Sequence, residues 1–179
     1  PAPRGPYLYY TRTVEGLSYP IHCRKRNLPD APEEILLDIN ALAEGHESTN
    51  VTAPALSPDH KLLAYAVDRT GYERPTLVIK NLETGEHLPD RIEPVGSWSL
   101  AWANDNRTLF YTGLDESNRP MSVRRHVLGT PAASDVTVLE EEDERFWVFV
   151  SRVLAGSHLL LSVSSKITSE ESLVSADRP

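Results

Sequence analysis

The sequence repeats itself at residues 56–65, which read Leu-Ser-Pro-Asp-His-Lys-Leu-Leu-Ala-Tyr, and at residues 100–111, which read Leu-Ala-Trp-Ala-Asn-Asp-Asn-Arg-Thr-Leu-Phe-Tyr. Each copy has an apolar segment, a polar turn and a second apolar segment, a pattern typical of two strands joined by a tight turn. Asp59 corresponds to Asp105 and Tyr65 to Tyr111, an offset of about 46 residues. A repeat of about 40–50 residues with four strands in each unit is typical of a β-propeller.

A weaker third copy runs from Val150 to Leu161, with Ala155-Gly156-Ser157 as its turn. The repeats divide the chain into four units, at approximately residues 1–47, 48–94, 95–143 and 144–179. We therefore predict that residues 1–179 form an all-β, partial β-propeller of about three to four blades, each a four-stranded antiparallel sheet. A closed propeller needs about four to eight blades, so we expect an open arc.

The second unit carries the clearest strand pattern. Its expected strands are Val51–Leu56, Leu62–Val67, Thr76–Leu82 and His87–Ile92. Glu83-Thr84-Gly85-Glu86 has the composition of a hairpin turn, with Gly85 able to adopt positive φ. Pro89 fits an edge strand better than a central one, because proline cannot donate to a strand ladder.

The first and last units look incomplete. Arg4-Gly5 occupies the place of the turn between the first and second strands, so the first strand of that unit is expected upstream of Pro1. The last unit shows segments for three strands, and the chain then stops before an outer strand. The chain also begins at proline and not at methionine, so it is expected to be processed or to be a piece of a longer protein.

Composition restricts the class of protein. With 40% hydrophobic and 25% charged residues among 179, the chain is expected to be globular. A formal net charge of −8 argues against binding to nucleic acid or to an anionic membrane. The single cysteine, Cys23, excludes an intrachain disulfide, and no secretory leader or membrane-spanning run is visible. These features predict a cytoplasmic protein.

No motif in this chain predicts an active site. There is no Gly-x-Ser-x-Gly nucleophile elbow, no phosphate- or dinucleotide-binding fingerprint, and no His-Glu-x-x-His among the six histidines. We therefore expect no catalytic residue, no bound metal and no cofactor here. The acidic run Glu140–Glu144 is best read as a solvated turn, although it could also draw cationic peptides into a cavity.

Trp98 and Trp102 flank a strand that the repeat places at the centre of the propeller. Inner strands line the central channel, so either indole could face a ligand there. Packing between neighbouring blades also needs bulky residues at such positions, and this is the stronger interpretation for both. They are the only candidate channel-facing residues.

Read together, these segments resemble the propeller of the oligopeptidase B type within the prolyl oligopeptidase family of serine peptidases. The matching segments are Tyr9-Tyr10-Thr11-Arg12-Thr13, Tyr19-Pro20-Ile21, Leu36-Leu37-Asp38, Asn40 to Glu47, Ser57-Pro58-Asp59, Thr84-Gly85-Glu86, Leu88-Pro89-Asp90, Trp102 to Thr112, and Lys166 with Thr168-Ser169-Glu170. Each short motif alone is common among propellers. The ordered set covers nearly the whole chain and is specific.

The resemblance implies a seven-bladed propeller joined to an α/β-hydrolase domain that is absent from this chain and carries a Ser–Asp–His triad. The parent protein would then be a serine endopeptidase acting on short peptides, with cleavage after Arg or Lys, and this fragment alone would be inactive. Its partners would be peptide substrates and its own hydrolase domain, and the isolated fragment would self-associate through open blade faces and strand edges. The alternatives are cleavage after Pro, or a non-enzymatic propeller that acts as a scaffold for protein partners.

Overall fold

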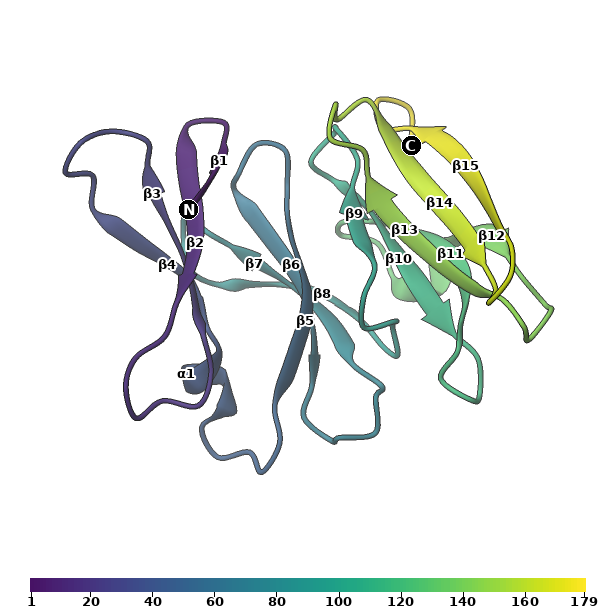
Figure 1. The fold of residues 1–179 in the computed structure, drawn as a ribbon, viewed down its shortest axis with the longest axis horizontal. Helices are drawn as coiled ribbons and strands as arrows, with labels where there is room; N and C mark the ends of the chain where they lie inside the picture. The colour runs from purple at the N-terminus through teal and green to yellow at the C-terminus, as the bar shows by residue number, and fades with distance from the viewer. The chain divides into compact units, whose positions relative to one another are not determined.

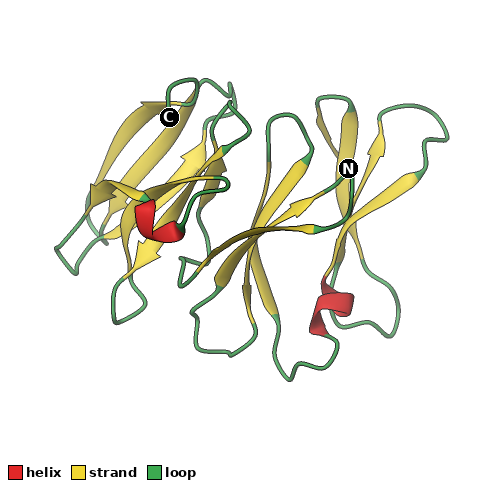
Figure 2. Ribbon diagram, turned by 180° about the vertical axis from the view of Figure 1, so that it is seen from behind, coloured by secondary structure: helices red, strands yellow, loops and turns green.

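The chain folds as a series of antiparallel sheets, seen in a computed structural model that describes residues 1–179 (Figure 1). Helix is confined to the short α1 (Ile39–Ala43) and the single 3₁₀ turn η1 (Ala132–Ser134), drawn in red in Figure 2. In each of the four sheets, strands adjacent in sequence are hydrogen-bonded neighbours. This consecutive order is the meander of a propeller blade, and the predicted all-β propeller fold is confirmed.

The strands fall into three four-stranded sheets and one three-stranded sheet. The first sheet contains β1 (Ala2–Arg4), β2 (Tyr7–Arg12), β3 (Ile21–Arg26) and β4 (Glu33–Asp38). The second contains β5 (Asn50–Leu56), β6 (Leu62–Asp68), β7 (Thr76–Asn81) and β8 (His87–Ile92). The third contains β9 (Leu100–Trp102), β10 (Thr108–Leu114), β11 (Pro120–Val127) and β12 (Val136–Glu140). The fourth contains β13 (Trp147–Arg152), β14 (His158–Ser164) and β15 (Ser169–Ser175).

The repeated Asp turn forms for a local reason. Asp105 accepts hydrogen bonds from the backbone of Arg107 and Thr108 and from the Thr108 hydroxyl, at 2.6–2.9 Å. The residue after each turn aspartate, His60 or Asn106, has a positive φ of 63° or 55°. His and Asn tolerate that left-handed region better than most residues. Burial raises the pKa of Asp105, but these hydrogen bonds outweigh burial and the net pKa is lowered.

One expectation about the first sheet is wrong. Its first strand is not confined to a segment upstream of Pro1, because β1 pairs with β2 within this chain, with Pro3 opposite Leu8. The Arg4-Gly5 turn was placed correctly, and Gly5 has a φ of 54°. Three residues suffice for this strand because it lies at the sheet edge, where proline is tolerated.

Two details of the second sheet are confirmed. Gly85 has a φ of 80° in the turn between β7 and β8, and nothing lies within 4 Å of the position that a Cβ would take. Strand β8, which contains Pro89, is an edge strand.

The chain divides into two compact units, residues 1–49 and 50–179. The core of the first unit consists of buried apolar side chains from β3, β4 and α1, including Ile21, Leu37 and Ile39.

The larger compact unit, residues 50–179, has two apolar clusters, and both include side chains of its middle sheet, β9–β12. One cluster joins the middle sheet to β5–β8 and contains Trp102, Leu109 and Tyr111. The other joins it to β13–β15 and contains Phe110 and Val148. Successive residues of β10 therefore face different clusters, as the alternation of a strand requires. Neighbouring sheets packed face to face in this way fix the loops between them.

Candidate functional site

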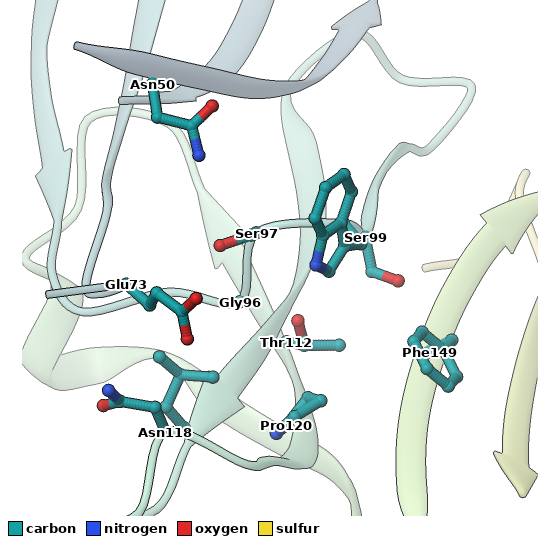
Figure 3. A pocket seen from close by; sticks show the side chains of 11 residues that line it. Asn50, Glu73, Gly96, Ser97, Ser99, Thr112, Asn118, Pro120 and Phe149 are labelled. Atoms are coloured by element: carbon teal, nitrogen blue, oxygen red, sulfur yellow. The ribbon is translucent and has the colours of Figure 1, made fainter. Parts of the chain in front are cut away.

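A hollow of about 140 Å³ opens where the three sheets of residues 50–179 approach one another. It is lined by the start of β5, the loop between β6 and β7, the connection from β8 to β9, the hairpin between β10 and β11, and the side of β13. The side chains that line it include Asn50, Glu73, Ser97, Trp98, Asn118 and Phe149. Figure 3 shows the Glu73 carboxylate and the Asn50 amide pointing into the space, with Phe149 on the opposite wall.

Asp68, at the end of β6, holds the Glu73 side of the hollow in place. Its carboxylate accepts hydrogen bonds from the backbone N–H groups of Thr70, Gly71 and Glu73, the last at 2.9 Å. Burial raises the pKa of Asp68, but the hydrogen bonds from Thr70, Glu73 and Gly71 outweigh it and the net pKa is lowered. Glu73 itself has a φ of 58°, which is unusual for a glutamate. The ionised Asp68 carboxylate therefore fixes a strained backbone that presents the Glu73 side chain.

A second link ties the hairpin of the third sheet to the loop of the second. The Arg74 guanidinium donates to the Asn118 side-chain oxygen at 2.9 Å, and the Asn118 amide donates to the Tyr72 carbonyl at 3.0 Å. Asn118 has a φ of 65°, a conformation that asparagine adopts readily. The two sides of the hollow are thus held by direct contacts between neighbouring sheets.

The two tryptophans take different positions. Trp102 is 1% exposed in the first apolar cluster, and its indole N–H donates to the Ala55 carbonyl at 2.9 Å. It has the packing role that was the stronger interpretation, and it offers no surface to a ligand in this structure. Trp98 is 75% exposed and lines the hollow. That Trp98 faces the channel of a complete propeller remains a prediction.

A buried polar cluster joins the second and third sheets, and no sequence motif predicts it. His126 on β11 is 1% exposed, with Nδ1 2.7 Å from Asp135 and Nε2 3.0 Å from Asp90 on β8. Both carboxylates are almost fully buried. The Tyr111 hydroxyl donates to Asp135 at 2.9 Å, and the Gly129 N–H donates to Asp90. Each ring nitrogen faces a carboxylate, so the imidazole satisfies both when both nitrogens carry a proton.

The preceding repeat has a related but simpler contact. Tyr65, the counterpart of Tyr111, lies 2.7 Å from Nε2 of His87 through its hydroxyl. Burial raises the pKa of Tyr65 to about 12. Burial also lowers the pKa of His87, and the positive charges of Lys80 and Arg69 add to that effect.

These clusters are suited to holding sheets together, and the hollow is suited to binding. The acceptors around His126 are two carboxylates, and no serine, threonine or cysteine is bonded to the ring, so the nucleophile–base pair of a covalent hydrolase is not formed there.

In the acidic run Glu140–Glu144, the hydrogen bonds from Arg145 lower the pKa of Asp143 to about 2. The chain contains no group of three or more His, Cys, Asp and Glu side chains placed to hold a metal ion. Neither helix is long and apolar enough to cross a membrane.

Comparison with known proteins identifies the fold family. The sequence model described as "Prolyl oligopeptidase, N-terminal beta-propeller domain" matches residues 1–178. The chain is 39% identical over 185 residues to "Protease 2" of Moraxella lacunata, across 100% of this chain and 27% of that protein. It is 40% identical over 190 residues to "Dipeptidyl aminopeptidase BI" of Pseudoxanthomonas mexicana, across 96% of this chain and 26% of that protein.

Solved structures of oligopeptidase B also match this chain. Oligopeptidase B from Leishmania major superposes with a TM-score of 0.90 at 31% identity, covering 98% of this chain and 25% of that one. Oligopeptidase B from Trypanosoma brucei with covalently bound antipain gives a TM-score of 0.85 at 36% identity, covering 96% and 24%. The chain therefore spans about a quarter of the length of the relatives that it matches.

Proposed function

Since this chain belongs to the family of N-terminal β-propeller domains of prolyl oligopeptidases, we propose that it is the substrate-selecting part of a longer, oligopeptidase B-like serine peptidase. The observation that carries the proposal is the match over nearly the whole chain, at 31–36% identity, to two oligopeptidase B structures. The proposed substrates of the whole protein are short peptides, cleaved after Arg or Lys. The proposed partner of this chain is a hydrolase domain that supplies the catalytic triad.

The proposed role of the propeller is gating. Acyl transfer by a serine peptidase needs a nucleophile, a base and an oxyanion hole, and this chain supplies none of them. Its contribution would lie in limiting access: a ring of blades around a narrow channel admits an extended peptide and excludes a folded protein. The polar and aromatic hollow beside the inner strands is compatible with contact to a peptide in transit.

Two alternatives remain for the specificity and the class. The relative named dipeptidyl aminopeptidase BI is as similar as the one named protease 2, so an exopeptidase mode of cleavage is a specific competitor for the endopeptidase mode. Cleavage after proline has weaker support, because the prolyl oligopeptidase structures match at 16–21% identity, a level that shows only the fold.

The decisive experiment uses the complete natural reading frame. We would measure its hydrolysis of fluorogenic peptides ending in Arg, Lys or Pro, with free or blocked amino termini, with and without a serine-directed phosphonate. Inhibitable cleavage after Arg or Lys in blocked peptides is expected. Cleavage restricted to peptides with free amino termini would replace the endopeptidase proposal with an exopeptidase. No cleavage and no labelled serine would favour a scaffold.

Two further parts of the proposal concern the environment of the chain. A cytoplasmic location is proposed from the single cysteine, which suits a reducing compartment, and fractionation of the source cells would test it. Self-association of the isolated chain is proposed because large apolar side chains are exposed in and beside β15, among them Leu173 (62%) and Ile167 (94%).

A further inference from the structure

We propose that the hollow beside Glu73 is a binding site for a positively charged peptide side chain, with a guanidinium group as its best ligand. The Glu73 carboxylate would pair with the cation, and the Trp98 indole would cover its apolar stem. This inference takes its ligand class, a peptide, from the proposed function. The position of the site rests on the geometry of this chain alone.

The next repeat of the same chain already shows a guanidinium in the equivalent place. In the third sheet, Asp115 directly follows β10 and accepts a hydrogen bond from the backbone N–H of Arg119 at 2.9 Å, as Asp68 does from Glu73 in the second sheet. The Arg119 side chain then reaches the connection to the following sheet. There its guanidinium donates to the carbonyls of Glu141, Asp143 and Phe146 at 2.9–3.3 Å.

In the second sheet the corresponding residue is acidic, and the space is open. Glu73 borders the connection from β8 to β9, just as Arg119 borders the connection from β12 to β13. The Glu73 carboxylate makes no hydrogen bond or ion pair in the structure and points into the hollow (Figure 3). The repeat thus places a guanidinium at one junction between sheets and a free carboxylate facing an open hollow at the other.

The size and lining of the hollow fit a single side chain. About 140 Å³ is well below the roughly 300–1,000 Å³ typical of pockets for drug-sized ligands. A cation beside a carboxylate gains a charge-assisted hydrogen bond, and an exposed indole adds a cation–π contact. Trp98, which is 75% exposed, provides that indole. The net charge of −8 favours the approach of cationic peptides.

Two positive groups lie near the hollow, and both are already engaged. Arg74 donates to Asn118, and Arg119 is paired with Asp115 at 2.9 Å. Neither guanidinium is hydrogen-bonded or ion-paired with Glu73. A ligand cation would therefore compete with no internal ion pair for the Glu73 carboxylate.

The test is a titration of the 179-residue chain with two peptides, acetyl-Gly-Arg-Gly-amide and the same peptide with citrulline, which is neutral and nearly isosteric. Nuclear magnetic resonance would follow the three indole N–H signals, assigned with Trp98→Phe and Trp147→Phe variants. We expect saturable movement of the Trp98 signal with the arginine peptide. The Trp102 signal should stay fixed, because its N–H is buried and bonded to Ala55.

Glu73→Gln should weaken binding of the arginine peptide about tenfold, since it removes a charged hydrogen-bond partner. Glu116→Gln is the matched control, because Glu116 is exposed in the neighbouring hairpin but does not line the hollow. Equal binding of both peptides, or equal losses in both variants, would overturn the proposal. Such a failure would leave the peptidase proposal intact, because hydrolysis by the whole protein is measured separately.

Discussion

The buried contact of His126 with Asp90 and Asp135 gives the sharpest prediction about stability. We consider His126→Leu, which removes both hydrogen bonds and keeps a buried apolar side chain of similar size. The two carboxylates are 4% and 1% exposed, so water cannot replace the lost partner without rearrangement. Asp135 would keep the Tyr111 hydroxyl, and Asp90 would keep the Gly129 N–H.

Leaving a buried hydrogen-bonding group without its partner costs about 1–3 kcal/mol for each group, and more where the group is charged. Two carboxylates lose a partner and each keeps one other hydrogen bond, so the expected loss is about 3 kcal/mol in total. Against a typical total of about 5–15 kcal/mol, such a loss is large. Adding Asp90→Asn to His126→Leu should recover at least about 1 kcal/mol, because it removes one of the stranded charges.

The assay is urea unfolding at pH 7 followed by tryptophan fluorescence. Trp98, Trp102 and Trp147 all lie in residues 50–179, so the signal reports on the unit that contains His126. His158→Leu is the control, because His158 is exposed and should change stability by less than about 0.5 kcal/mol. A loss below about 1 kcal/mol for His126→Leu, or no recovery with Asp90→Asn, would refute the reasoning.

Four other outcomes are expected. Because the pKa of His87 is lowered on folding, the unfolded chain binds more protons as pH falls through about 6.5. Unfolding free energy should therefore fall between pH 7 and 5.5, and His87→Gln should flatten that fall in urea titrations. Asp115 has a pKa of about 2, because hydrogen bonds outweigh the raising effect of burial. Its contribution is present above about pH 4 and is lost toward pH 2. Asp115→Asn should lower stability at neutral pH and reduce the acid sensitivity, and an unchanged acid profile would contradict this. A Cβ at Gly96 would lie 2.0 Å from the Thr112 hydroxyl oxygen, so Gly96→Ala should cost about 1–3 kcal/mol in the same assay. Light scattering should show mass rising with concentration, and Leu173→Lys should reduce it; a clean monomer at high concentration would count against exposed apolar surface as a cause.

The parts of the fold that sequence predicts well are those decided within a few residues. The Asp105 turn is recognisable because its hydrogen-bond partners follow within three residues, and Pro89 marks an edge because of its missing N–H. β1 was misjudged for the opposite reason. Its Pro-rich residues argue against a strand in isolation, and only pairing with β2 makes the strand possible.

The hollow and the His126 cluster depend on contacts between sheets. Asp90 and His126 are 36 residues apart, and no local pattern connects them. Trp98 and Trp102 look alike in sequence, yet one is exposed and the other buried, because the strand begins between them and turns only Trp102 into the core. One signal within the sequence was usable: the repeat offset of about 46 residues that pairs Tyr65 with Tyr111 also pairs Glu73 with Arg119, and so marks a junction where the repeat changes charge.

Because side chains alternate between the two faces of β10, this one strand contributes to both interfaces with its neighbouring sheets. Leu109 and Tyr111 belong to one apolar cluster and Phe110 to the other. A single-residue insertion within β10 would turn every later side chain to the opposite face and so exchange the residues offered to the two neighbouring sheets. The register of β10 is therefore constrained by both neighbouring sheets at once. Insertions in this unit should be tolerated in its hairpin loops and rejected in β10.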